Sequence, residues 1–143
     1  MALRCALCFP ACAAALLWAG AVSAGELRVT VRGVPSAEGD VRVGLYATPE
    51  AFEKRERTFG MVAPARKGDV EVVFPDLPPG RYGVVAIHDV NGNGKLDMNL
   101  LGIPTEPYGF GNDAKINLAP PSFEDMAVTV GTAPVETALT LRR

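Results

Sequence analysis

The chain has 143 residues, and its 14 basic and 16 acidic side chains give a formal net charge of −2 at pH 7. It contains no run of basic residues, so nucleic acid and anionic membranes are poor candidate partners. All three cysteines lie within the first 24 residues, and His88 is the only histidine. Residues 25–143 therefore have no disulfide framework, and a zinc site is nearly excluded.

Residues 1–24 have the pattern of an export signal. Arg4 supplies a positive start, an apolar run extends from Cys5 to Val22, and Val22-Ser23-Ala24 has the small-x-small form of a cleavage site. The alternative is a transmembrane anchor, because the run is close to the roughly 18 residues at which spanning becomes plausible. The cleavage-like end favours a signal that is removed after Ala24, and no cysteine follows the run to carry a lipid. We expect one exported domain of residues 25–143, periplasmic or extracellular, with no membrane attachment after cleavage.

Strand-like alternation of apolar and polar residues dominates residues 25–143, which is typical of half-buried strands. The run from Tyr82 to Ile87 is apolar on both faces and predicts a central strand, and Met61–Ala63 is a further short candidate. The alternating sets are Leu27/Val29/Val31, Val41/Val43/Leu45, Val70/Val72/Phe74, Met126/Val128/Val130 and Val135/Thr137/Leu139/Leu141. About seven short strands without a crossover helix predict an all-β fold, a single antiparallel β-sandwich of immunoglobulin-like or transthyretin-like type.

The connecting segments contain typical turn residues. Residues 35–40 predict a turn that joins the first two strands as a hairpin, and residues 75–80 predict a second turn. Residues 49–54 predict one helical turn capped by Thr48. Residues 120–123 predict a rigid lead into the next strand, with Phe123 in the core.

The segment from Asp89 to about Ala114 has no convincing strand pattern. Connections beyond about 12–15 residues without regular structure are uncommon in compact domains. This one is too apolar and aromatic for a disordered linker, since it includes Ile103, Tyr108 and Phe110. We expect an ordered loop that packs against the end of the sandwich.

Side-chain oxygens at alternate positions of this loop indicate a candidate Ca²⁺ site. With Asp89 as position 1, Asn91 and Asn93 occupy positions 3 and 5, Gly94 is at the sharp turn, Lys95 offers a backbone carbonyl and Asp97 occupies position 9. The loop departs from an EF-hand, because Leu100 replaces the bidentate glutamate and no helices flank it. A missing ligand would come from Glu106 or Asp113, with Asn99 as a further candidate.

A simpler interpretation is a turn scaffold without metal. Asn-Gly pairs form tight turns, and Asp and Asn side chains bond to nearby backbone groups. His88 is interpreted as a strand-end residue that bonds to the loop. A hydrolase that uses His88 with Asp89 or Asp97 is the weakest alternative, because neither Ser36 nor Ser122 lies in a nucleophile-elbow context.

Several motifs occur in one order along the chain: Phe74-x-Asp-Leu-Pro-x-Gly-x-Tyr82, His88-Asp-x-Asn-Gly-Asn-Gly-Lys-Leu-Asp97, Gly102-Ile-Pro-x-Glu-x-Tyr-Gly-Phe110 and Pro120-Pro-Ser-Phe123. The first resembles the turn and strand of transthyretin-like and carboxypeptidase-regulatory-like domains. Together they resemble domain-of-unknown-function family 2141, small exported bacterial proteins. That resemblance implies an exported β-sandwich without an established activity or cofactor. It also makes Glu106 the preferred additional ligand.

The sequence as a whole favours an exported binding or structural module over an enzyme. In the leading interpretation Asp89, Asn91, Asn93 and Asp97 bind Ca²⁺ through side-chain oxygens, Lys95 through its carbonyl, and Glu106 through a further carboxylate. The alternative is a metal-free module that binds a protein or a glycan through the loop aromatics Tyr108 and Phe110.

Overall fold

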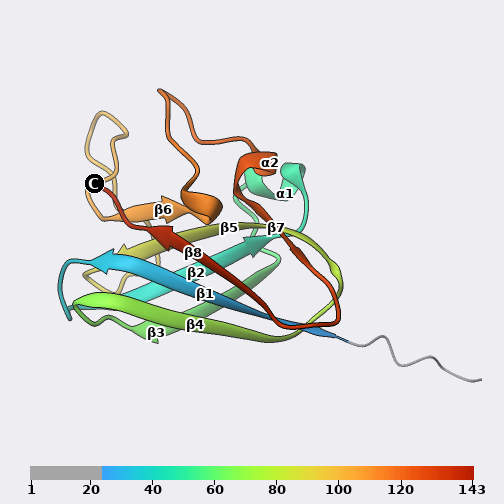
Figure 1. Cartoon of the computed structure of the whole chain (residues 1–143). Helices are drawn as coiled ribbons and strands as arrows, with labels where there is room; N and C mark the ends of the chain where they lie inside the picture. Colours follow the sequence, from blue (N-terminus) through green and yellow to red (C-terminus); the bar gives the residue numbers. More distant parts are fainter. Residues whose placement is uncertain (1–23) are drawn as a thin grey trace, which may run out of the picture.

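Two β-sheets packed face to face form the body of the molecule (Figure 1). This computed structural model describes residues 24–143, so the predicted export signal lies outside the described residues except for Ala24. Among the described residues, no helix has the length and apolar character needed to cross a membrane.

The smaller sheet has three strands and is built around β1. Its strands, in the order β4-β1-β8, are β4 (Gly68–Leu77), β1 (Gly25–Val34) and β8 (Val135–Thr140). β1 pairs with β4 in antiparallel register and with β8 in parallel register. The alternation predicted for β1 is confirmed, because Leu27, Val29 and Val31 are fully buried on its inner face.

The larger sheet has five strands and is built around β5. Its strands are β3 (Phe59–Pro64), β2 (Asp40–Tyr46), β5 (Gly80–Asp89), β6 (Tyr108–Phe110) and β7 (Ala127–Val130). One edge of β5 pairs with β2, and the other pairs with β7 along its first half and with β6 along its second half. The central strand predicted at residues 82–87 is therefore confirmed.

Two apolar clusters lie on opposite faces of the larger sheet. The main core lies between the two sheets and includes Val43, Val84 and Ala86. Because side chains alternate along a strand, the outer face carries a second cluster, formed by Tyr46, Phe110, Phe123 and Met126. Phe123 is buried, as predicted, although in this second cluster rather than between the sheets.

Three short helical segments adjoin the larger sheet: α1 (Pro49–Glu53), η1 (Gly111–Asp113) and α2 (Phe123–Met126). The cap predicted for α1 is confirmed, because the Thr48 hydroxyl accepts a hydrogen bond from the Ala51 N–H at 3.1 Å. The Ser122 hydroxyl caps α2 in the same way. Met126, which was predicted to lie in a strand, ends α2 instead.

Three expectations about connectivity are corrected. β1 and β2 lie in different sheets, so residues 35–39 cross between layers and do not form a hairpin. Tyr108–Phe110 forms a strand within the segment expected to lack one, which raises the number of described strands to eight. The β1–β8 pair is parallel, so the sandwich is not wholly antiparallel. The first and third corrections arise because alternation marks a strand without specifying its partner.

Candidate functional site

The candidate site is the long connection between β5 and β6, residues 90–107. Its two ends meet where the His88 N–H donates to the Pro107 carbonyl at 2.8 Å. A bridge between Met98 and Pro104 closes its outer part. The sequence predicted an ordered loop here, and the structure shows one whose two ends meet at a narrow base.

Asp89 anchors the start of the loop from the last position of β5. Its side chain is fully buried. Oδ2 accepts hydrogen bonds from the Gly94 N–H at 2.7 Å and from Arg42 Nε at 2.6 Å, and Oδ1 accepts one from the Asn93 N–H at 3.1 Å. Arg42 comes from β2, two residues beyond the position paired with Asp89. The sequence pattern of the loop gave no sign of this arginine.

The environment of Asp89 favours its charged form. Burial by itself raises the pKa of this carboxyl group, but hydrogen bonds from Gly94, the Arg42 guanidinium and Asn93 outweigh it. The pKa of Asp89 is therefore held below its ordinary value. Asp89 is therefore an ionised carboxylate, and both of its oxygens accept hydrogen bonds.

Glu106 holds the far side of the same loop. Its side chain is buried, and its two oxygens accept from two backbone N–H groups, Val90 at 2.9 Å and Asp97 at 3.1 Å. Because these two groups lie at opposite ends of residues 90–97, one carboxylate closes the turn. Both oxygens of Glu106, the preferred additional ligand in the sequence-based prediction, therefore accept backbone N–H groups of the loop in this structure.

Three side chains converge at the exposed side of the turn formed by residues 90–97: those of Asn91, Asn93 and Asp97. The side-chain amides of Asn91 and Asn93 donate to the two Asp97 oxygens at 2.5 and 2.7 Å. The Asn91 and Asn93 oxygens accept from the backbone N–H groups of Asn93 and Lys95, at 3.1 and 2.9 Å. These are the Asx turns expected in the metal-free interpretation, with Gly92 and Gly94 in left-handed conformations.

The structure thus brings the five side chains of the predicted ligand set into one hydrogen-bonded loop; the sixth predicted ligand is the Lys95 carbonyl. Lys95 takes part through its backbone N–H, and its side chain is exposed. The other two candidate ligands bond elsewhere: Asp113 accepts from the Thr140 N–H, and Asn99 accepts from Leu101 and Ile103. Within residues 24–143, no group of three or more His, Cys, Asp or Glu side chains is arranged to hold a metal.

His88 lies on the opposite face of β5 from Asp89. Its side chain is fully buried. It lies on the same face of the larger sheet as the side chain of Val41, its cross-strand partner, which points into the core. Its Nε2 lies 2.7 Å from the Glu38 carbonyl, and Nδ1 has no hydrogen-bond partner among the described residues. The imidazole therefore faces the core and the connection between β1 and β2, rather than the loop carboxylates.

The two loop aromatics differ in accessibility. Phe110 is buried in the second cluster, whereas Tyr108 is half-buried, and their rings make an edge-to-face contact at 5.9 Å. Both line a groove of about 370 Å³ that extends towards Thr140 and Arg142. A binding surface at this position would therefore present Tyr108 more than Phe110.

Glu106→Gln is expected to open the loop. Glutamine keeps one acceptor oxygen but turns an NH₂ group towards one of the two backbone N–H groups, so one buried hydrogen bond is lost. The expected decrease in the free energy of unfolding is about 1–3 kcal/mol. Hydrogen exchange at the Val90 and Asp97 amides measures the local effect. Unchanged protection at both amides would contradict the closure of the loop by Glu106.

The family comparison matches most of the chain. No curated protein and no solved structure matches the chain. A family described as uncharacterised proteins conserved in bacteria matches residues 29–138, from within β1 to within β8 and including the whole of the loop. The chain therefore belongs to this family, DUF2141.

Proposed function

We propose that the protein is an exported, non-enzymatic binding or structural module whose loop at residues 89–97 binds Ca²⁺ weakly. The pattern of residues 1–24 supports export to the periplasm or beyond the cell. The role of the ion is to stabilise the loop on the end of the sandwich.

The convergence of Asn91, Asn93 and Asp97 carries this proposal. The Asp97 carboxylate receives only the two asparagine amides among the described hydrogen bonds. An asparagine amide presents an oxygen in place of its NH₂ group when it rotates about its last torsion. A cation that replaces the two amide donors would therefore meet three oxygen ligands in one place.

Asp89 and Glu106 are already held at the same loop, which limits the rearrangement that binding requires. The Oδ1 atom of Asp89 accepts one hydrogen bond and retains a lone pair, whereas Oδ2 accepts two. Arg42 competes with a cation for this carboxylate, and rotation of the asparagines gives up two Asx turns. Both effects place the affinity in the range of extracellular modules, with a Kd of about 10⁻⁴–10⁻³ M.

Calcium is expected to raise the melting temperature of the protein. At about 10 mM Ca²⁺, roughly ten times the weaker end of that Kd range, binding to the folded state adds about 1.4 kcal/mol. For a domain of this size the midpoint rises by about 5 °C or more. Calorimetry in calcium and in chelator measures the shift.

Two variants distinguish a specific site from a general ionic effect. Asp97→Asn removes the charge at the point of convergence and should abolish the shift. Asn99→Ala removes a neighbouring Asx turn that serves residues 101 and 103, and should keep the shift. An equal response of the protein and of the Asp97→Asn variant would refute the calcium site.

A further inference from the structure

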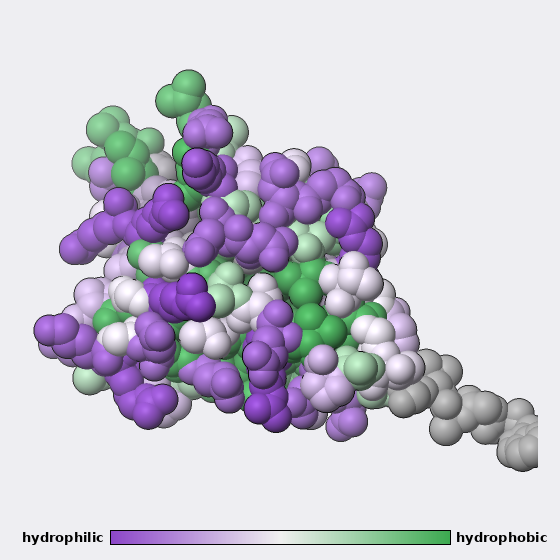
Figure 2. Space-filling view, in the orientation of Figure 1, coloured by the Kyte–Doolittle hydropathy of each residue, from purple (hydrophilic) through white to green (hydrophobic). Residues whose placement is uncertain are grey.

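We propose that two apolar loop tips and the cationic groove beside them form a docking surface for an anionic lipid bilayer. The first prong is residues 98–103 and the second prong is residues 115–118. Figure 1 shows both projecting from the same side of the sandwich, above β6, and Figure 2 shows hydrophobic residues at both tips. The exposed apolar side chains are Met98, Leu100, Leu101 and Ile103 on the first prong, and Ile116 and Leu118 on the second.

Neither packing nor backbone preference accounts for these leucines. The exposed fractions of Leu100, Leu101 and Leu118 are 105%, 82% and 109%. Leu118 also has a left-handed backbone, with φ of 63°, which favours glycine or asparagine over leucine. A gathering of exposed aliphatic side chains marks a protein or membrane interaction site.

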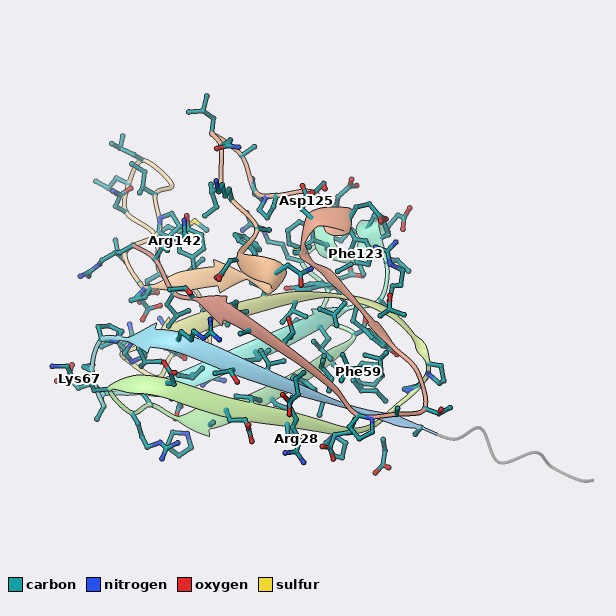
Figure 3. The ribbon with its side chains drawn as sticks, viewed as in Figure 1. Arg28, Phe59, Lys67, Phe123, Asp125 and Arg142 are labelled. Carbon is teal, nitrogen blue, oxygen red and sulfur yellow. The ribbon has the colours of Figure 1, made fainter. Side chains whose placement is uncertain are left out.

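The C-terminal residues connect the two prongs. Arg143 Nε donates to the Thr105 carbonyl at 2.9 Å, next to the first prong. Arg142 pairs through its backbone with Tyr108, and Figure 3 places it at the base of the prongs. Lys115 and both arginines line the 370 Å³ groove together with the second prong. The prongs and the groove therefore form one surface.

The groove has a positive local charge. Asp113 is the only carboxylate among its lining side chains, and it accepts a hydrogen bond from the Thr140 N–H at 2.6 Å. The three cations are Lys115 and the adjacent pair Arg142 and Arg143, which lie 27 residues further along the chain, so they form no basic run in the sequence. At physiological salt, charges beyond about 8 Å are largely screened. For a headgroup near the groove, the three local cations therefore matter more than the net negative charge of the whole chain. This proposal departs from the sequence-based expectation that anionic membranes are poor candidate partners.

The shape of the surface favours lipid over a protein partner. Protein interfaces concentrate their energy in aromatic and arginine anchors that fill pockets. The groove contains aromatic and arginine side chains, but the most exposed apolar residues are aliphatic and lie on the projecting prongs, where a fluid acyl layer accommodates them without a complementary shape. Apolar insertion combined with attraction of cations to anionic headgroups is the usual basis of interfacial binding.

Vesicle partitioning in chelator tests the surface independently of calcium. Vesicles of phosphatidylcholine with and without phosphatidylglycerol are sedimented with the protein of residues 25–143 and with variants of the same length, so that the apolar run of the predicted export signal does not contribute to binding. Leu101→Asp and Leu118→Asp should each weaken binding about tenfold or more, because each removes one inserted leucine. Lys115→Gln and Arg142→Gln should each weaken binding about fivefold on the anionic vesicles only.

Met61→Asp is the matched control. Met61 is an exposed apolar residue on β3, at the edge of the larger sheet opposite to β6, and its replacement should leave binding unchanged. Unchanged melting temperatures show that the variants remain folded. Equal partitioning of the protein and a Leu101→Asp/Leu118→Asp double variant would overturn the proposal. So would self-association in solution that depends on these leucines without binding to vesicles, which would assign the surface to a second copy of the chain.

Discussion

Replacing Asp89 by alanine is expected to lower the free energy of unfolding by about 3–5 kcal/mol, as for other buried ion pairs that lose one partner. The carboxylate is fully buried and accepts three hydrogen bonds, one of them from the Arg42 guanidinium. Its removal leaves a partly buried cation and the Gly94 N–H without this acceptor, whereas the Asn93 N–H keeps its second acceptor, Asn91 Oδ1. Urea denaturation of the protein and the variant measures the loss.

Asp40→Asn provides a control that shares the same arginine. The Asp40 carboxylate lies 3.6 Å from Arg42 and is partly exposed. Exposed ion pairs contribute about 0–1 kcal/mol, so this variant should stay close to the original stability. Similar losses for Asp40→Asn and Asp89→Ala would show that burial of Asp89 is not the source of its contribution.

The pH dependence of the free energy of unfolding gives a second measure of the stabilisation by Asp89. Because its folded pKa lies below the ordinary value of 3.8, the unfolded chain takes up the proton first as the pH falls. The stabilisation by Asp89 is therefore fully present above about pH 4 and decreases as the pH falls through the folded pKa. The stability difference between the protein and an Asp89→Asn variant should be constant at neutral pH and shrink in acid. A difference that stays constant into acid would contradict the lowered pKa.

The sequence predicts the strands of this fold better than their pairing. Alternation identifies β1, β2, β4 and β8, because burial of one face requires it. It carries no information about which strand lies next to which, so the predicted hairpin at residues 35–40 is wrong. Tyr108–Phe110 escapes prediction because three residues are too few to show a period.

The candidate site, too, is predicted only in part from the sequence. The spacing of Asp89, Asn91, Asn93 and Asp97 identifies a loop whose side chains converge, since alternate oxygens turn inward in a tight curl. The role of Arg42 depends on the register between β2 and β5, which local sequence does not encode. Glu106 was one of two candidates for the missing ligand and became the preferred one through family resemblance, whereas its two hydrogen bonds to backbone N–H groups depend on the three-dimensional closure of the loop.

Gly39→Ala is the second substitution with a large expected effect, a decrease of about 3 kcal/mol or more in the free energy of unfolding. Gly39 has φ of 67°, which costs an alanine about 1–2 kcal/mol. An added Cβ would lie 2.0 Å from the Asp89 carbonyl oxygen and 2.6 Å from that of Val90. Both are backbone atoms at the base of the loop, so the residue 35–39 connection has to move away from β5. Overpacking of this kind adds about 1–3 kcal/mol or more. Urea denaturation measures the total.

Gly102→Ala separates the cost of the left-handed backbone from the cost of the steric overlap. Gly102 has a similar φ of 74°, but an added Cβ there meets no atom within 4 Å. It should therefore show only the backbone cost of about 1–2 kcal/mol. The difference between the two variants measures the close approach of residue 39 to the end of β5. If both lose the same stability, the base of the loop is not held by this contact, and the connection between the sheets has room to shift without disturbing Asp89.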